Sequence, residues 1–277
     1  MSNEIKTGVV DVNGAKIGYS EKGTGSPLIL IHGGGAGASG VSNYRKNIDA
    51  FADRYRVIVP DLPGFGVSEN KYEDGPIFNA LANVMLGLMD ALAVEKADLV
   101  GNSLGGGTAL KMALLNGDRV GRLVLMGPGG SLPAHTPMPT EGLLRMMIYY
   151  AGEGPTREKL KKIVELLVFD PSTITEPLLE ERFKASTRDD VVSNPPLRRG
   201  IGHADDMLWR APLEKVKNDV LLVWGREDRV IPLDAYVPLL KALPNASLHV
   251  FPNCGHWAQW EKAEQFNALV LNFLAGK

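Results

Sequence analysis

Short apolar segments alternate with amphipathic segments along most of this chain, and that alternation limits the folds it can adopt. The runs apolar enough to be strands buried on both faces are 27–35, 55–64, 96–103, 122–128, 220–225 and 246–253. The segments with apolar residues at helical spacing are 80–94, 107–117 and 264–275. Strands that alternate with helices predict an α/β fold, with a mostly parallel sheet flanked by helices on both faces.

The first segment follows a different pattern. Residues 8–23 alternate polar and apolar side chains around Asn13-Gly14, a dipeptide typical of tight hairpin turns. We therefore expect an antiparallel edge on the parallel sheet.

The alternation stops between about 131 and 208. Residues 131–142 contain prolines spaced too closely for a core strand. The helical patterns that follow are 143–151, 156–169, 175–187 and 198–210. Because binding crevices in such sheets lie at the carboxyl ends of the strands, we predict a core of residues 1–130 and 206–277 and a helical lid, residues 131–205, over that crevice.

Charge and cysteine content exclude several classes of protein. The 30 basic and 32 acidic residues are spread along the chain, so no basic block is available to bind nucleic acid. Cys254 is the single cysteine, which excludes an internal disulfide and fits a reducing compartment. Residues 1–10 lack the pattern of a signal peptide, and no run is apolar enough for a membrane span. We expect a cytoplasmic protein that does not bind a membrane.

Ser103 lies in the most distinctive stretch, LVGNSLGGGTAL at 99–110. It falls where a predicted strand gives way to a helix, the context of a nucleophile elbow. Gly101 and Gly105 leave room for the tight turn that such an elbow requires. The alternative is a small residue in a glycine-rich bend, and the strand–turn–helix context favours the nucleophile.

A serine nucleophile needs a base, and His256 is the best candidate among the five histidines. It follows a predicted strand and sits in a glycine-bounded loop, at the sheet edge where the elbow also ends. His249 lies inside a strand, which favours a structural role. The remaining histidines, in the glycine run or the insertion, are His32, His135 and His203.

The base in turn needs an orienting acid, and GREDRVIP at 225–232 supplies two carboxylates after a strand. We prefer Asp228 to Glu227, because Asp228 fits the pattern G-x-x-D-x-x-x-P that ends this loop. The order Ser103, Asp228, His256 is that of the α/β-hydrolase triad.

Acyl chemistry also needs donors for a developing oxyanion. HGGGAGASG at 32–40 follows the first buried strand and has the form of an oxyanion-hole loop. We predict that the N–H groups of Gly34 and Leu104 form the oxyanion hole. The alternatives are a flexible turn and a phosphate cradle, and the second lacks the lysine of a P-loop.

With these residues in place, the chain resembles the meta-cleavage product hydrolases, carbon–carbon bond hydrolases of the α/β-hydrolase superfamily in bacterial aromatic degradation. The motifs that carry the resemblance are HGGGAGASGVSNY, GNSLGGGTAL, LVLMGPGG, WGREDRVIPLD and CGHWAQWE. It implies cleavage of a 2-hydroxy-6-oxohexa-2,4-dienoate to 2-hydroxypenta-2,4-dienoate and a carboxylic acid, without metal or organic cofactor, by a homo-oligomer. Many relatives have proline where this chain has Ala36.

The resemblance also implies a reaction sequence. His256 helps the dienol become its keto tautomer, and Ser103, or a water that it activates, then attacks the C6 carbonyl. Both an acyl-enzyme and a gem-diolate intermediate fit the sequence.

Such a substrate carries a carboxylate and an enolate, so the site needs hydrogen-bond donors. Asn102 and Trp257 neighbour Ser103 and His256 and can each donate; a turn asparagine and a packing tryptophan are the alternatives. The resemblance adds Arg182 and Asn43 as substrate-binding residues. By sequence alone Arg182 is an arginine on a charged helix face.

The predicted lid contains apolar residues that could line a pocket for the group attached at C6. They are Met138, Met146, Met147, Ile148, Leu167 and Val168. Residues of this kind more often form the core of a lid.

Two other functions fit the same residues. A carboxylesterase would use the same triad but would not need the arginine at 182. A ligand receptor on this fold would retain the triad with slow turnover, although no partner-binding stripe stands out. Asp61, in DLPGFGVS, is expected to hold a structural turn.

Overall fold

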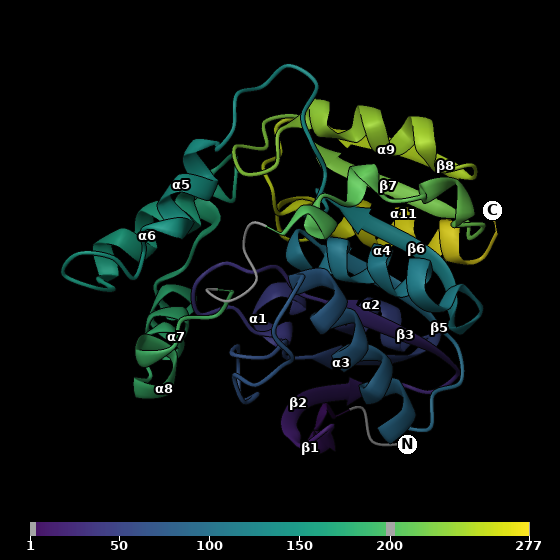
Figure 1. The fold of residues 1–277 in the computed structure, drawn as a ribbon, viewed down its shortest axis with the longest axis horizontal. Helices are drawn as coiled ribbons and strands as arrows, with labels where there is room; N and C mark the ends of the chain where they lie inside the picture. Colours follow the sequence, from purple (N-terminus) through teal and green to yellow (C-terminus); the bar gives the residue numbers. More distant parts are fainter. Residues whose placement is uncertain (1–3, 198–202, 277) are drawn as a thin grey trace.

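A single sheet of eight strands forms the centre of the computed structural model, which describes residues 4–197 and 203–276 (Figure 1). The strands are β1 (Lys6–Val12), β2 (Ala15–Lys22), β3 (Ser26–Ile31), β4 (Tyr55–Pro60), β5 (Ala97–Asn102), β6 (Val120–Met126), β7 (Val220–Gly225) and β8 (Ala246–Phe251). Their order across the sheet is β1-β2-β4-β3-β5-β6-β7-β8.

The sheet is parallel from β4 to β8 and antiparallel at one edge. β1 pairs antiparallel with β2, and β2 pairs antiparallel with β4. Asn13 and Gly14 join β1 to β2 with φ of 53° and 79°, the left-handed conformation that a two-residue hairpin turn requires. The predicted hairpin and the mostly parallel α/β sheet are therefore confirmed.

Helices cover both faces of the sheet (Figure 1). Those outside the segment between β6 and β7 are α1 (Gly40–Tyr44), α2 (Ile48–Ala52), α3 (Ile77–Ala91), α4 (Leu104–Asn116), α9 (Tyr236–Ala242), α10 (Ala258–Glu261) and α11 (Ala263–Leu274). Successive residues of a strand point to opposite faces. In β3, Ile29 and Ile31 pack in a core cluster with α3, α4 and α9, while Leu28 and Leu30 pack in a second cluster with α1, α2 and α11.

The segment between β6 and β7 is helical and extends to one side of the sheet in Figure 1. Its helices are α5 (Glu141–Met147), α6 (Arg157–Leu166), α7 (Glu176–Ser186) and α8 (Asp189–Ser193). Threonine caps α5, α6 and α7: Thr140, Thr156 and Thr175 each accept a hydrogen bond from the N–H three residues on. No strand forms in the described part of this segment.

The predicted helical segments 107–117 and 198–210 differ in outcome. The first belongs to α4, which ends at Asn116 with Gly117 as its C-cap, in a right-handed conformation with φ of −55°. The helical pattern at 198–210 yields only the 3₁₀ turns Ala204–Asp206 and Leu208–Arg210, and its residues 198–202 lie outside the described part. Within 4–197 and 203–276, no helix is long and apolar enough to span a membrane.

Candidate active site

Ser103 occupies a sharp turn between β5 and α4. Its φ of 53° and ψ of −114° are unfavourable for a residue with a side chain. Neighbouring backbone holds it there: the Ser103 N–H donates to the Met126 carbonyl at 2.8 Å, and the Ser103 carbonyl accepts from the Gly129 N–H at 2.7 Å. A strained residue fixed by tertiary hydrogen bonds at the end of a central strand has the geometry expected of a nucleophile elbow.

Two glycines make this turn possible. A Cβ at Gly101 would overlap the Gly105 carbonyl, and a Cβ at Gly105 would overlap the Ile31 carbonyl. Both obstacles are backbone, which cannot rotate away as a side chain can. The glycines flanking Ser103 are therefore required by close approach of α4 to β5 and β3.

Asp228 and His256 form a buried pair at the ends of β7 and β8. His256 Nδ1 lies 2.7 Å from Asp228 Oδ2. The other carboxylate oxygen, Oδ1, accepts from the N–H groups of Val230 at 2.8 Å and Ile231 at 3.0 Å. Because the carboxylate accepts from Nδ1–H, the second imidazole nitrogen, Nε2, is left as an acceptor.

Glu227 has a different task from its neighbour Asp228. Its carboxylate accepts from the Cys254 N–H at 3.0 Å and from Arg226 Nε at 2.7 Å. These contacts tie together the loops after β7 and β8. Of the two candidates for the orienting acid, Asp228 contacts the imidazole of His256 and Glu227 does not.

His32 is buried beside the glycine run, and both of its ring nitrogens have partners. Nε2 accepts from the Leu62 N–H at 2.9 Å, so Nδ1 carries the proton and donates to the Gly33 carbonyl at 2.8 Å. Burial lowers the pKa of His32. His249 lies in β8 with its ring against Phe251, whereas His135 and His203 are exposed.

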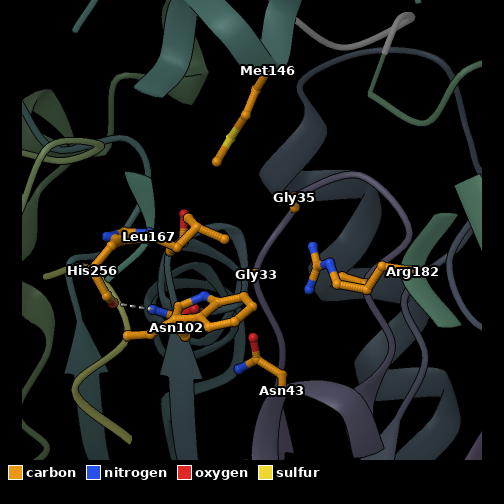
Figure 2. Close-up of a pocket in the computed structure, with 12 residues that line it drawn as sticks. Gly33, Gly35, Asn43, Asn102, Met146, Leu167, Arg182 and His256 are labelled. Atoms are coloured by element: carbon orange, nitrogen blue, oxygen red, sulfur yellow. Dashed lines mark hydrogen bonds between the residues drawn. The ribbon is translucent and has the colours of Figure 1, made fainter. Parts of the chain in front are cut away.

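A cleft opens above the carboxyl ends of the strands (Figure 2). It is lined by Gly33, Gly34, Gly35, Ala38, Asn43, Asn102, Ser103, Met146, Leu167, Arg182, His256 and Trp257. The predicted nucleophile and base, 153 positions apart in the chain, thus face one cavity. The Ser103 hydroxyl does not hydrogen-bond His256 in this structure, since Nε2 has no partner among the described residues.

Arg182 enters the cleft from α7 and is completely buried (Figure 2). Its Nε donates to the Ala36 carbonyl at 3.1 Å, and its guanidinium lies 5.1 Å from the ring centroid of Trp257. Neither Nη1 nor Nη2 has a partner among the described residues. Burial, and to a lesser extent the charge of Arg45, lowers the pKa of Arg182 to about 10.

Two asparagines add further unpaired atoms. Asn102 Nδ2 donates to the His256 carbonyl at 3.3 Å, the dashed contact in Figure 2, while its Oδ1 has no partner among the described residues. Asn43, on α1, is 2% exposed, and its Nδ2 likewise has no partner among the residues that the structure describes. The amide of Asn102 therefore holds the loop that carries His256, a contact that its sequence position did not indicate.

The predicted oxyanion donors lie on facing elements. Gly34 lines the cleft, whereas Leu104 does not. Leu104 is the first residue of α4, and the first N–H groups of a helix have no partner within it. The Leu104 side chain lies 3.1 Å from where a Cβ on Gly34 would stand, so the two segments are in contact.

Most of the apolar residues expected at the pocket lie elsewhere. Met146 and Leu167 line the cleft. Val168 is buried away from it, and Met138, Met147 and Ile148 are exposed. Within α5, Gly142 is the one fully buried residue and approaches the Val230 backbone, Leu143 and Met146 are half-buried, and Leu144 and Met147 are exposed.

Sequence reasoning missed the backbone contribution of Gly33, Gly35 and Ala38 to the cleft. The glycine run at 32–40 was the signal that could have indicated these residues, but only Gly34 was predicted from it, as an oxyanion donor. Asp61 was correctly expected to hold a turn, because its carboxylate accepts from the N–H groups of Gly40 and Val67. In the described residues no cluster of His, Cys, Asp or Glu could hold a metal ion.

Known proteins share this fold and much of this sequence. Residues 26–263 match the alpha/beta hydrolase fold family, and the chain belongs to it. A curated relative from Burkholderia vietnamiensis, 42% identical over 96% of this chain and 93% of its own length, is a 2-hydroxy-6-oxononadienedioate/2-hydroxy-6-oxononatrienedioate hydrolase. One from Comamonas testosteroni, 43% identical over 95% and 93%, is a 2-hydroxy-6-oxo-6-phenylhexa-2,4-dienoate hydrolase.

A solved structure agrees with these relatives. It is a mutant of the meta-cleavage product hydrolase CumD from Pseudomonas fluorescens IP01, complexed with acetates. It matches with a TM-score of 0.83 and 34% identity over 97% of each chain. The present protein is a hydrolase of this carbon–carbon bond-cleaving group, as the sequence motifs indicated.

Proposed function

We propose that this protein hydrolyses the C5–C6 bond of a 2-hydroxy-6-oxohexa-2,4-dienoate, giving 2-hydroxypenta-2,4-dienoate and a carboxylic acid in bacterial aromatic degradation. One observation carries the proposal. Four cleft residues present five buried polar atoms without partners in the described part of the chain: Arg182 Nη1 and Nη2, Asn43 Nδ2, Asn102 Oδ1 and His256 Nε2. Buried polar groups are nearly always paired, so such a concentration favours a polar, anionic ligand.

Arg182 holds the acidic end of this substrate. Its two Nη groups can form charge-assisted hydrogen bonds to the carboxylate or enolate, and the anion offsets the cost of a buried guanidinium. Asn43 Nδ2 and the indole N–H of Trp257, two further residues that line the cleft, supply additional donors. Asn102 acts partly through the His256 carbonyl, to which it is bonded.

Ser103, His256 and Asp228 perform the chemistry. Asp228 fixes the tautomer in which His256 Nε2 accepts a proton. His256 assists transfer of the proton from the C2 hydroxyl to C5, which gives the keto tautomer. Ser103 Oγ, or water deprotonated beside it, then adds to C6; the C5–C6 bond breaks, its electron pair forms the dienol, and one water is consumed overall.

Gly34 and Leu104 stabilise the oxyanion that forms at C6. The loss of one such donor typically costs about 3–4 kcal/mol in the barrier. The glycine at 34 supports this role because it allows the backbone to approach the ligand closely.

The helical segment 131–205 acts as the lid over a core formed by 1–130 and 206–277. Support comes from Met146, Leu167 and Arg182, which reach the cleft from this segment. By the same family relationship we propose a cytoplasmic homo-oligomer. The buried single thiol of Cys254 is compatible with a reducing compartment.

Direct assay tests the function. The coloured 6-phenyl, 6-methyl and 6-unsubstituted dienoates should lose their colour when mixed with the protein, at rates that identify the preferred group on C6. Failure to bleach any of them, with rapid hydrolysis of nitrophenyl esters, would instead establish the carboxylesterase. The two Nη groups of Arg182, which have no partner among the described residues, favour the dienoate, because a neutral ester has no anion to pair with them.

A further inference from the structure

Glu261, the last residue of the CGHWAQWE motif, joins two segments that border the cleft. Its Oε2 accepts from the Gly255 N–H at 2.7 Å, in the loop that carries His256. Its Oε1 accepts from the N–H groups of Phe169 at 2.8 Å and Asp170 at 3.0 Å, just after α6. One carboxylate thus satisfies three backbone donors from two regions that are distant in the chain.

The two segments are in close contact at this point. The Trp257 N–H donates to the Leu167 carbonyl at 3.0 Å. A Cβ on Gly255 would lie 2.8 Å from Val168 Cα, so the lid backbone packs directly on the histidine loop. Leu167 lines the cleft, and its position therefore depends on how firmly this contact is held.

His256 itself has anchors that do not involve Glu261. Its ring is bonded to Asp228 and its carbonyl to Asn102. Among the described residues, the Trp257–Leu167 bond is the one backbone hydrogen bond that joins segment 167–170 to this loop. A weakened Glu261 contact should consequently loosen the lid wall while leaving the His256–Asp228 pair in place.

We propose that Glu261 is a positioning residue that holds the lid segment 167–170 against the loop of His256 and so sets the closed cleft for the dienoate. The inference rests on the proposed function because it takes the dienoate as the substrate; the hydrogen bonds of Glu261 do not depend on that function. Charged acceptors form the stronger hydrogen bonds. A glutamine at 261 has one acceptor oxygen, so it satisfies either Gly255 or the lid donors, and its NH₂ group faces the others.

The test compares two substrates in Glu261→Gln. We expect kcat/KM for the dienoate to fall about tenfold, mainly through a higher KM, which corresponds to the loss of one such hydrogen bond. Hydrolysis of p-nitrophenyl acetate, which is too small to need the lid, should stay within about twofold. Glu264→Gln is the matched control, because Glu264 is exposed, lies three residues away, and has a side chain that forms no hydrogen bond or ion pair with the described residues.

Parallel loss of both activities, or no change in either, would overturn the proposal; a purely structural glutamate would lower the folded fraction and leave both KM values unchanged. Hydrogen exchange of the unaltered protein gives a second test if the variant does not fold. The amides of Gly255, Phe169 and Asp170 should open together with similar protection. Exchange of the two lid amides orders of magnitude faster than that of Gly255 would contradict the coupling. An unaltered protein inactive on dienoates would reject the proposed function alone.

Discussion

Replacement of Arg182 by methionine should separate stability from activity. Arg182→Met keeps a long, unbranched side chain and removes the charge. Burial lowers the pKa of Arg182 well below its ordinary value, to about 10. At about 1.4 kcal/mol per pH unit, keeping the charge in the empty cleft costs about 3 kcal/mol. This cost is present in full below pH 10, where both the folded and the unfolded state hold the proton. It is relieved as the pH rises above 10, because the folded state then releases the proton before the unfolded state does.

The favourable interactions that the guanidinium makes are of similar size. The bond to the Ala36 carbonyl contributes about 1 kcal/mol, and the interaction with Trp257 about 1–2 kcal/mol. In Arg182→Met, the loss of these two interactions therefore offsets most of the stability gained by removing the buried charge. We expect the free energy of unfolding of Arg182→Met, measured in urea, to stay within about 1 kcal/mol of the unaltered protein.

Activity on the dienoate should fall sharply in the same variant. Two charge-assisted hydrogen bonds to the substrate anion contribute at least about 3 kcal/mol together, so kcat/KM should drop by at least about a hundredfold. Turnover of p-nitrophenyl acetate should change less than about threefold. Arg145→Met is the control: Arg145 is a half-buried arginine of α5 that pairs with Glu141, and its replacement should alter neither activity. Equal losses on both substrates, or destabilisation above about 3 kcal/mol, would show that Arg182 supports the fold instead of the substrate.

Three further variants test the remaining residues. Asp228→Asn should lower kcat about 10⁴-fold by favouring the wrong tautomer of His256, whereas Glu227→Gln should cost less than tenfold; comparable losses would reassign the acid. Ser103→Ala should abolish both activities. In denaturant, Ser103→Gly should be about 1 kcal/mol more stable than Ser103→Ala, because glycine tolerates φ of 53°. Equal stability of the two variants would mean that the turn is not strained. Gly105→Ala should destabilise by about 3 kcal/mol or more, since its Cβ meets the Ile31 carbonyl, and a soluble variant with normal stability would refute that clash.

The sequence predicted those parts of the fold that obey a local period. Strands such as β3 and β7 are buried on both faces and read as continuous apolar runs, and α3 and α11 are long enough to show helical spacing. The helices α1, α2 and α8 have five residues each, too few for a period to be recognised.

The positions of the candidate catalytic residues were predictable where a residue type and a strand end coincide, as at Ser103, Asp228 and His256. The residues that line the cleft were less predictable, because tertiary packing determines which side chains reach it. Met147 is a residue type expected in an apolar pocket, yet it is exposed, whereas its neighbour Met146 lines the cleft. The role of Glu261 arises from the meeting of residues 169–170 with Gly255, which no local pattern encodes.

The hydrogen bonds of His32 bear on how acid inactivation of this enzyme should be interpreted. A second imidazole adjoins the cleft, but one of its nitrogens already accepts an N–H and the other already donates, so it has no site at which to take up another proton without breaking a buried contact. Burial also lowers the pKa of His32, so mild acidification should leave this imidazole neutral and its contacts with Leu62 and Gly33 in place. A loss of turnover under mildly acidic conditions should therefore not be assigned to His32.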